Sequence, residues 1–470
     1  MVRNTIARHK LILPLILLYG LLISIVDLHY NSVFIDEAYH ITMGHEVLNR
    51  EPCPGCPYAT GSVRIHPVLA AIGDSIGGIY GARIVNVLFG LLLTAAVYGT
   101  AMLLFEGSYG LIAALLFLCT GQTLYLMKLA TYDMIAAFNL GAAFFLLVLS
   151  TKVQPQWHRN AALLLGAAAL FLACITKYLL PVFVPALVLY ALFSHGIRRT
   201  ILFYIIPLAI LLALFVLFDE YAPRSTVINQ IRTYRDITVP LSTIFDWAFR
   251  WVAFVLLLAV FGIFHEKRGK TALMLIVLSS PIIVLHLVTR AEQSVNKNMI
   301  FALIFLAPAA ALGVDHMAKI FSFGTKSRVV RAFFAAAVLV IFWAYGLFNL
   351  RWLERQYPDV TPVIQFFQEQ GFDGMTVAMN GWDGVIYEYT LGTRFPHARF
   401  LNLREVRKTE VPEPSFMERV DFVICEDLYY GKLTPCDQFS RYFEHGYVLL
   451  RNFPIEHSWG LTDATIYGRR

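Results

Sequence analysis

Two adjacent carboxylates, Asp36 and Glu37, come about seven residues after the first apolar run of the chain ends. A turn or helix at that point would hold both side chains close to the membrane surface. A carboxylate in such a place can accept the proton of an attacking hydroxyl group, or it can hold a divalent cation. The alternative is that Asp36 only caps a helix that starts at Glu37. The sequence leaves both interpretations open.

A further acidic residue, Asp133, lies at the start of an apolar run, five residues after Lys128. A carboxylate at membrane depth costs about 2.5 to 3.5 kcal/mol on insertion scales, so it normally faces a polar cavity or a partner. We expect Asp133 to face a polar cavity. The alternative is a surface ion pair between Lys128 and Asp133, which would contribute little to stability.

Several basic residues lie at the ends of apolar runs or in the loops between them. Cations collected there could bind the phosphate group of a lipid and stabilise its negative charge. The alternative is that they only contact lipid headgroups or extend to the membrane surface. The residues in question are Lys177, Arg224, Arg232, Arg235, Arg290 and Lys297.

The segment Cys53-Pro54-Gly55-Cys56 has the spacing of a metal-binding knuckle, but no second pair of this spacing completes a set of four thiolates. A local disulfide is therefore the favoured interpretation. A metal site remains the alternative, because His40, His45 and His66 lie in the same loop. Cys425 and Cys436 also fall on the expected outer side of the membrane, where disulfides persist.

The elements that must position these residues are apolar helices. The chain has 470 residues, of which 58% are hydrophobic and only 15% charged, whereas soluble domains have about 25% charged residues. The apolar residues gather in runs long enough to cross a hydrocarbon core of about 30 Å as helices. The eleven runs are 11–29, 82–104, 109–127, 134–150, 161–176, 178–194, 200–218, 247–264, 271–289, 299–316 and 332–350.

The distribution of Lys and Arg predicts the orientation, because basic residues in short loops are retained on the cytoplasmic side. With the N-terminus inside, the inner loops are short and dense in positive charge. The outer loops 30–81, 128–133 and 219–246 are mostly longer and carry few basic residues for their length. We therefore expect a protein of the plasma or inner membrane with a cytoplasmic N-terminus and, after eleven crossings, an extracytoplasmic C-terminus.

The composition changes near residue 351, where charged residues become common. This change predicts a transmembrane domain over 1–350 and a soluble extracytoplasmic α/β domain over 351–470. In the soluble domain, the patterns predict a helix over 360–370 and strands over 375–379, 420–425 and 447–452.

The outer loop 30–81 is too long to be a simple connector. We expect a helix over 37–49, and a second helix that His66-Pro67 opens, since Pro is well tolerated in a first helical turn.

Six short motifs then resemble those of a known family. They are Asp36-Glu37-Ala38-Tyr39, Arg64-Ile65-His66-Pro67-Val68-Leu69, the stretch from Gly81 to Gly90, the stretch from Lys128 to Phe138, Thr176-Lys177-Tyr178, and Asn296-Lys297-Asn298-Met299 before Pro308. The pattern resembles the GT-C glycosyltransferases related to protein O-mannosyltransferases and lipid A aminoarabinose transferases. It covers about residues 30 to 316 and departs from the family at Val68, where the family has Pro, and at Lys128, where it has Arg.

The resemblance implies a multispan enzyme that uses a polyprenyl-phosphate sugar, with an acidic loop residue near the acceptor and basic residues near the donor phosphate. The acceptor would be a lipid, a glycan or a protein on the outer face of the membrane, and the transfer would invert the configuration of the anomeric carbon. A divalent cation held by Asp36 and Glu37 is the one cofactor to consider. With the charged residues above, the expected site has Asp36 and Glu37 as catalytic residues. The expected substrate-binding residues are His66, Lys128, Asp133, Lys177, Arg232, Arg235 and Lys297.

Other classes of function fit the sequence less well. The net charge of +6 comes largely from the inner loops and forms no basic stripe interleaved with aromatics, so we expect no nucleic-acid partner. A lipid or glycan transporter is the main alternative, but no repeated halves and no paired Gly/Pro breaks are visible. A scaffold whose outer domain binds a partner is a further alternative. Neither the transporter nor the scaffold explains the charged residues of the first loop.

Overall fold

The described part of every apolar run lies mainly in helices of the computed structural model. The chain divides into two units, which are described separately: the membrane unit, Met1–Leu28 with Met43–Leu350, and the second unit, His29–Thr42 with Arg351–Arg470. The structure describes residues 2–26, 28, 32–53, 55–56, 59–106, 108–219, 239–290, 294–321, 328–355, 359–379, 384–402, 420–426, 428–429, 432–433, 446–457 and 460–469.

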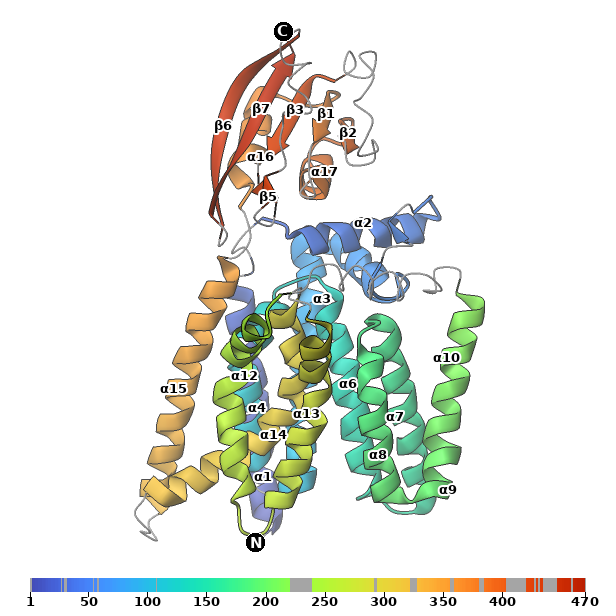
Figure 1. Ribbon diagram of the computed structural model, residues 1–470, viewed down its shortest axis with the longest axis vertical. Coiled ribbons are helices and arrows are strands. Elements are labelled where there is room, and N and C mark those ends of the chain that lie inside the picture. Colours follow the sequence, from blue (N-terminus) through green and yellow to red (C-terminus); the bar gives the residue numbers. More distant parts are fainter. Residues whose placement is uncertain are drawn as a thin grey trace. The chain divides into compact units, whose positions relative to one another are not determined.

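The membrane unit is built from helices (Figure 1). Helix α2 (Ile35–Asn49) begins in the second unit and ends in the membrane unit. The others are α1 (Val2–Val26), α3 (His66–Phe105), α4 (Tyr109–Leu118), α5 (Gly121–Met127), α6 (Tyr132–Ser150), α7 (Gln156–Thr176), η2 (Leu180–Phe183), α8 (Val184–His195), α9 (Ile197–Thr200), η3 (Ile201–Ile205), α10 (Ile206–Phe218), α12 (Leu241–Ile263), α13 (Gly269–Thr289), α14 (Val295–Phe321) and α15 (Arg328–Glu354).

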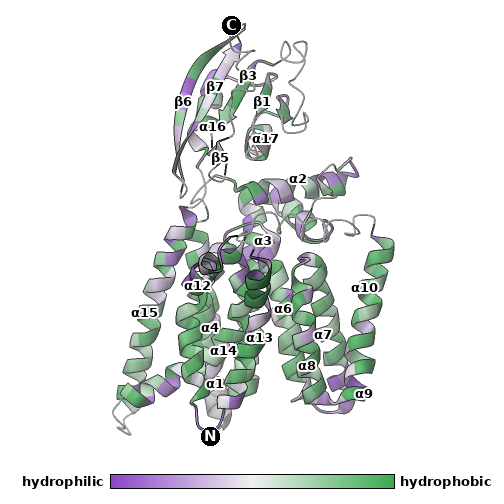
Figure 2. Cartoon of the chain, viewed as in Figure 1, coloured by the Kyte–Doolittle hydropathy of each residue, from purple (hydrophilic) through white to green (hydrophobic). Residues whose placement is uncertain are grey.

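Within the described residues, eight helices are long and apolar enough to cross a membrane, and α4 with α5 forms a bent pair that also qualifies. Two shorter apolar helices, Ile12–Val26 and Leu180–His195, complete the set that corresponds to the expected spans. Figure 2 shows hydrophobic residues along most of the length of these helices. The protein is therefore an integral membrane protein, as predicted, while the direction of the crossings stays a prediction.

The expected span 109–127 is not one straight helix, because α4 and α5 meet at a bend of 67°. Thr120 starts α5 as its N-cap, and its side chain accepts a hydrogen bond from the backbone N–H of Thr123. Helix α15 packs closely at this break, since a Cβ atom on Gly346 would lie 1.8 Å from the carbonyl oxygen of Cys119. The break thus coincides with a close approach of two backbones.

Helix α14 is the most deeply buried of the candidate spans and packs against both α12 and α13 (Figure 1). Small residues allow this packing: a Cβ atom on Gly313 of α14 would lie 1.7 Å from the carbonyl oxygen of Leu258 in α12. Close backbone approach at small residues is the usual way in which membrane helices associate. The second half of α14 is therefore held closely against α12.

The first loop contains the two helices that were predicted there. Helix α2 covers Ile35–Asn49, and α3 opens at His66 with Pro67 in its first turn. Helix α3 is kinked at Gly77 and Gly78, and Gly78 has a φ of 60°, which favours glycine.

The second unit contains a mixed five-stranded sheet in the order β2-β1-β3-β7-β6. Strand β1 (Thr376–Met379) pairs in parallel with β2 (Arg399–Asn402) and β3 (Phe422–Glu426). Helix α17 (Gly384–Gly392) connects β1 to β2, as parallel pairing requires a crossover. Strands β6 (Tyr447–His457) and β7 (Gly460–Arg469) form an antiparallel hairpin beside β3, and β4 (Leu428–Tyr429) pairs with β5 (Lys432–Leu433).

The predicted helix and strands of this unit correspond to α16 (Thr361–Gln370), β1, β3 and β6. Strands β2 and β7 were not predicted. Strand β2 has only four residues, and β7 carries Asp463 and Gly468, so its neighbours in the sheet stabilise it more than its own composition. An aromatic core lies beside the sheet, where the Phe367 ring is 4.8 Å from Phe372 and 5.5 Å from Phe422.

Candidate functional site

A buried cluster of charged and polar side chains lies where α6 begins, α7 ends and α14 begins. Asp133 is in the first turn of α6, and Lys177 caps the end of α7. The Lys177 ammonium donates a hydrogen bond to Asp133 Oδ1 in an ion pair whose side chains are only 7% and 2% exposed. Asp133 therefore has a partner inside the protein, and this partner is Lys177.

Hydrogen bonds extend this pair in two directions. Thr131 Oγ1 donates to Asp133 Oδ2 over 3.0 Å. The Lys177 ammonium donates to Asn298 Oδ1 of α14 over 2.6 Å, and Asn298 Nδ2 lies 3.0 Å from His286 Nε2 of α13. Four helices of the membrane unit thus contribute to one connected polar network.

Lys297 adds a second cation to this network. It is 6% exposed, and its charge acts on the Asp133 carboxylate. Its backbone N–H donates to the side-chain oxygen of Asn296 over 2.8 Å, which fixes the first turn of α14. Of the three charged residues Asp133, Lys177 and Lys297, two are cations, so the cluster favours an anion such as a phosphate group.

Aromatic rings surround the Lys177 ammonium. It lies 5.2 Å from the centre of the Tyr132 ring and 5.3 Å from the centre of the Phe301 ring, within cation–π range. The Tyr132 ring also contacts His66, whose ring is edge-on at a centroid distance of 6.4 Å. The expected residues His66, Asp133, Lys177 and Lys297 are therefore brought together in one region.

The first loop is attached to this region through its backbone. The Ser62 N–H donates to the Ile175 carbonyl over 2.7 Å, and the Tyr178 N–H donates to the Thr60 carbonyl over 3.0 Å. Between them, a Cβ atom on Gly61 would lie 1.8 Å from the Thr176 carbonyl oxygen, so only glycine fits. The loop thus adds backbone to the wall of the site beside Lys177.

Lys128 lies in the turn between α5 and α6 and is 1% exposed. Asn86 of α3 fixes this turn, because its amide nitrogen donates to the carbonyls of Leu129 and Thr131, the latter over 2.6 Å. Burial of both Lys128 and Asp133 contradicts the alternative of a surface ion pair between them.

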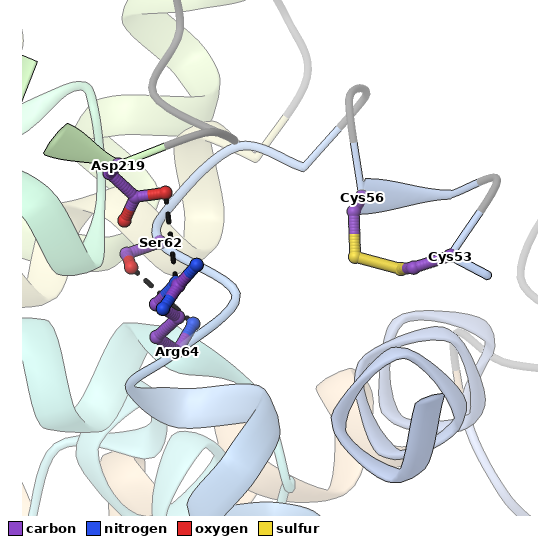
Figure 3. The surroundings of a disulfide bond; sticks show 5 residues. All are labelled: Cys53, Cys56, Ser62, Arg64 and Asp219. Atoms are coloured by element: carbon purple, nitrogen blue, oxygen red, sulfur yellow. Dashed lines mark hydrogen bonds and ion pairs between the residues drawn. A yellow bond between two sulfur atoms is a disulfide. The ribbon is translucent and has the colours of Figure 1, made fainter. Parts of the chain in front are cut away.

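Figure 3 shows the end of the first loop, where the Arg64 side chain points toward Asp219 at the end of α10, with an Nε–Oδ1 distance of 3.8 Å. The same figure shows Cys53 and Cys56 joined by a disulfide, with Cα atoms 5.4 Å apart. The favoured interpretation of this cysteine pair, a local disulfide, is confirmed.

The two carboxylates of the first loop have different local roles. Helix α2 begins at Ile35 rather than at Glu37, and the Phe34 carbonyl accepts its first backbone hydrogen bond from Ala38. The residue that caps the helix is Glu37, whose fully buried carboxylate accepts the N–H of Phe34 over 2.9 Å, as in one half of a capping box. Asp36 is half-buried in the first turn, so the alternative that it is the N-cap is wrong.

Some of the remaining expected residues lie outside the described part of the chain. Arg224, Arg232 and Arg235 lie outside the described residues, as does Cys436. Cys425 is disulfide-bonded, and His45 pairs with Asp74 over 2.8 Å. Within the described part of the chain, no three His, Cys, Asp or Glu side chains are grouped so as to hold a metal ion.

Sequence reasoning missed two members of the network, His286 and Asn298. His286 is 3% exposed and lies within an apolar run. A histidine in a predicted membrane span is itself a signal of a polar partner or function. Asn298 belongs to the motif that was quoted for Lys297, but an amide carries no charge and was given no role.

Comparisons with known proteins agree with this architecture. Residues 66–219 match the family model described as dolichyl-phosphate-mannose-protein mannosyltransferase. The crystal structure of ArnT from Cupriavidus metallidurans bound to undecaprenyl phosphate superposes with a TM-score of 0.61 at 13% identity, covering 96% of this chain and 97% of that one. The chain has the GT-C glycosyltransferase fold. The resemblance expected from the sequence is confirmed at this level.

Two other structures share the GT-C fold. The Archaeoglobus fulgidus oligosaccharyltransferase tethered with an acceptor peptide gives a TM-score of 0.51 at 13% identity, with 88% of this chain and 69% of that chain covered. The arabinofuranosyltransferase AftD from Mycobacteria gives 0.54 at 13% identity, and this chain covers 41% of its length while 97% of this chain is matched. No curated protein matches the chain in sequence.

Proposed function

We propose that the protein is a membrane glycosyltransferase that transfers a sugar from a polyprenyl-phosphate carrier to a lipid, glycan or protein acceptor on the outer face of the membrane. The observation that carries this proposal is the buried cluster of Asp133, Lys177 and Lys297, which has more cationic than anionic residues. A buried cation in a membrane protein normally has a functional partner. The GT-C fold and the undecaprenyl phosphate bound by ArnT make a lipid phosphate the natural ligand.

The charge of the cluster suits the chemistry of such a transfer. The acceptor oxygen forms a bond to the anomeric carbon, and the bond from that carbon to the phosphate oxygen breaks. The electron pair stays on the phosphate, so a phosphodiester with one negative charge becomes a monoester with about 1.5 to 2 negative charges at pH 7. Lys177 and Lys297 would stabilise this additional charge as it develops.

Asp36 is our candidate for the base that takes the proton of the acceptor hydroxyl. Its carboxylate is not the helix cap, because Glu37 has that role, and its place in the Asp36-Glu37-Ala38-Tyr39 motif resembles the acidic motif of the family. A second product of the reaction is then the protonated Asp36 carboxyl group, which returns its proton to solvent. Whether a divalent cation assists is tested by adding a chelator to the same assay.

The orientation belongs to the same proposal. The Cys53–Cys56 disulfide is of a kind that forms in oxidising compartments outside the cytosol, and it supports an outer location for the first loop. We propose a cytoplasmic N-terminus and an extracytoplasmic second unit, in the plasma or inner membrane.

The test is transfer of radiolabelled sugar from a polyprenyl-phosphate sugar to extracted lipid and protein fractions by the purified protein in liposomes. Lys297→Gln should weaken donor use by about 1.5 to 3 kcal/mol, the scale of one charge-assisted contact. Lys319→Gln is the matched control, because Lys319 is an exposed lysine of the same helix. Transfer that is equal in both variants would remove Lys297 from the donor site, and donor transport without transfer would show a transporter instead.

Asp36→Asn tests the base against a matched variant, Glu37→Gln. Asn cannot accept the proton, so transfer should fall by about 10²-fold or more. Gln at position 37 can still accept the Phe34 N–H as a capping residue, so Glu37→Gln should retain activity. Near-wild-type transfer by folded Asp36→Asn protein would assign the base to another residue, with Asp133 the next to test.

A further inference from the structure

We infer that His286 and Asn298 are positioning residues for the donor phosphate: together they hold the Lys177 ammonium in the place where it meets that group. The inference rests on the proposed function and gives a role to two uncharged residues of the network. The geometry consists of the 2.6 Å bond from Lys177 Nζ to Asn298 Oδ1 and the 3.0 Å contact between Asn298 Nδ2 and His286 Nε2.

The chemistry of the three side chains fixes the direction of both hydrogen bonds. An ammonium group can only donate, so the amide oxygen of Asn298 must face Lys177. The amide nitrogen then faces His286 and can only donate, so His286 Nε2 must accept and the ring must be neutral with its proton on Nδ1. One tautomer of His286 is thus matched to one orientation of the Asn298 amide.

Burial makes the loss of either hydrogen bond costly. Both His286 and Asn298 are 3% exposed, and Lys177 is 6% exposed, so bulk water is a poor substitute for a lost partner. The contact also crosses from α13 to α14, twelve residues apart in the sequence. It therefore ties the Lys177 site to a helix that contributes none of the charged residues of the cluster.

Without an acceptor at position 286, the Asn298 NH₂ group loses its hydrogen bond to the ring, and only the bond from Lys177 still orients the amide. The buried NH₂ group can then regain a partner only if the Asn298 side chain moves. The Lys177 ammonium, which this amide positions, moves with it, out of the place where it binds phosphate. The expected consequence is a weaker donor complex with an unchanged acceptor complex.

The experiment compares His286→Leu with His286→Gln in full-length protein in liposomes. Leu removes the acceptor, whereas the Gln side-chain oxygen can accept at about the place of Nε2. We expect the KM for the polyprenyl-phosphate sugar to rise about tenfold in His286→Leu, the upper end of the scale for one lost hydrogen bond between neutral groups. His286→Gln should restore most of it, and the acceptor KM should not change in either variant.

His265→Leu is the matched control, because it removes another histidine of the bundle, one that lies 3.4 Å from the Tyr109 hydroxyl outside the candidate site. Its donor KM should equal that of wild type. Asn298→Asp provides a second route if His286→Leu does not fold. The carboxylate still accepts from Lys177 but cannot donate to His286 and adds a negative charge, so the donor KM should rise here too.

A wild-type donor KM in folded His286→Leu, or in Asn298→Asp, would overturn the inference while the proposed function stood. A rise in His286→Leu that His286→Gln does not reverse would also overturn it, since packing and not the acceptor would then matter. Wild-type protein that transfers no sugar from any polyprenyl-phosphate donor would instead overturn the proposed function itself.

Discussion

Two charged clusters use the same helix, α14, near its two ends. Near the start, Asn298 joins the cluster of Asp133 and Lys177, whose side chains are 2% and 7% exposed. Near the other end, Asp315 accepts from the Tyr109 hydroxyl over 3.1 Å and pairs with Lys319 over 2.7 Å, with side chains 29% and 46% exposed. The residue types are similar, but the surroundings are not.

The difference shows what burial does to an ion pair. Water screens the Asp315–Lys319 pair, so it contributes at most about 1 kcal/mol. Burial, with Lys319 nearby, lowers the pKa of His265 beside this pair, so the ring adds no charge near pH 7. The Asp133–Lys177 pair is removed from water, and loss of either partner leaves a buried charge. We therefore expect stability and function to depend on the first cluster alone.

The largest effect should come from Lys177→Met. It leaves the Asp133 carboxylate without its hydrogen-bonded cation, and breaking a buried pair in this way costs about 3 to 5 kcal/mol. Thermal unfolding in detergent should show a large fall in midpoint. Adding Asp133→Asn to the same protein removes the stranded charge and should recover most of the stability but not sugar transfer. If the single variant unfolds like wild type, the two clusters do not differ as we describe.

A smaller loss should follow Asn86→Ala. The Asn86 amide donates to two buried carbonyls, those of Leu129 and Thr131, and their loss as a pair should cost about 2 to 3 kcal/mol. Unfolding of this variant measures the cost. Asn160→Ala is a control at an asparagine of α7 whose buried side-chain oxygen accepts no hydrogen bond from the described residues. Equal stability of the two variants would show that the Asn86 hydrogen bonds do not stabilise the turn before α6.

Thr131→Val should have a more modest effect. Valine keeps the shape of threonine but removes the hydroxyl that donates to Asp133 over 3.0 Å, which should cost about 1 to 2 kcal/mol. Thr131→Ser keeps the hydroxyl and should behave like wild type. The comparison of the two unfolding midpoints isolates the hydrogen bond, and identical midpoints would argue against it.

The smallest effect should come from Asp315→Asn at the exposed cluster. The Tyr109 hydroxyl can still donate to the amide oxygen, and only a screened ion pair is lost, so stability should change by less than about 1 kcal/mol. Sugar transfer should be unchanged. A loss of transfer comparable to that of Lys297→Gln would mean that the second cluster also takes part in function.

Much of this architecture could be predicted because it depends on local composition. A run such as 134–150 must cross the membrane as a helix wherever its neighbours lie, since only a helix satisfies its backbone in lipid. The Cys53–Cys56 pairing was also accessible, because two cysteines three residues apart have few other partners within reach. The ionisable residues His66, Asp133, Lys177 and Lys297 were found for a similar reason, since ionisable groups in apolar surroundings are costly.

Partner choice could not be predicted from composition. In the sequence, Lys128 was only an alternative partner for Asp133, and the fold pairs Asp133 with Lys177, which is 44 residues away in the chain. The sequence left open whether Asp36 caps a helix that starts at Glu37, whereas α2 starts earlier and Glu37 supplies the capping contact. His286 lies within an apolar run, so its place in the network was not predicted. Strand β7 was not predicted either, because its pairing with β3 and β6 stabilises it.

The sequence by itself thus determined that the chain crosses the membrane many times, that its composition changes near residue 351, and which ionisable residues are out of place in lipid. These properties follow from the transfer free energy of each segment, which is a sum over nearby residues. Only the tertiary structure decided that Asp133, Lys177, Asn298 and His286 form one hydrogen-bonded network. A hydrogen bond depends on distances of about 3 Å between atoms of different helices, and helix packing alone fixes those distances.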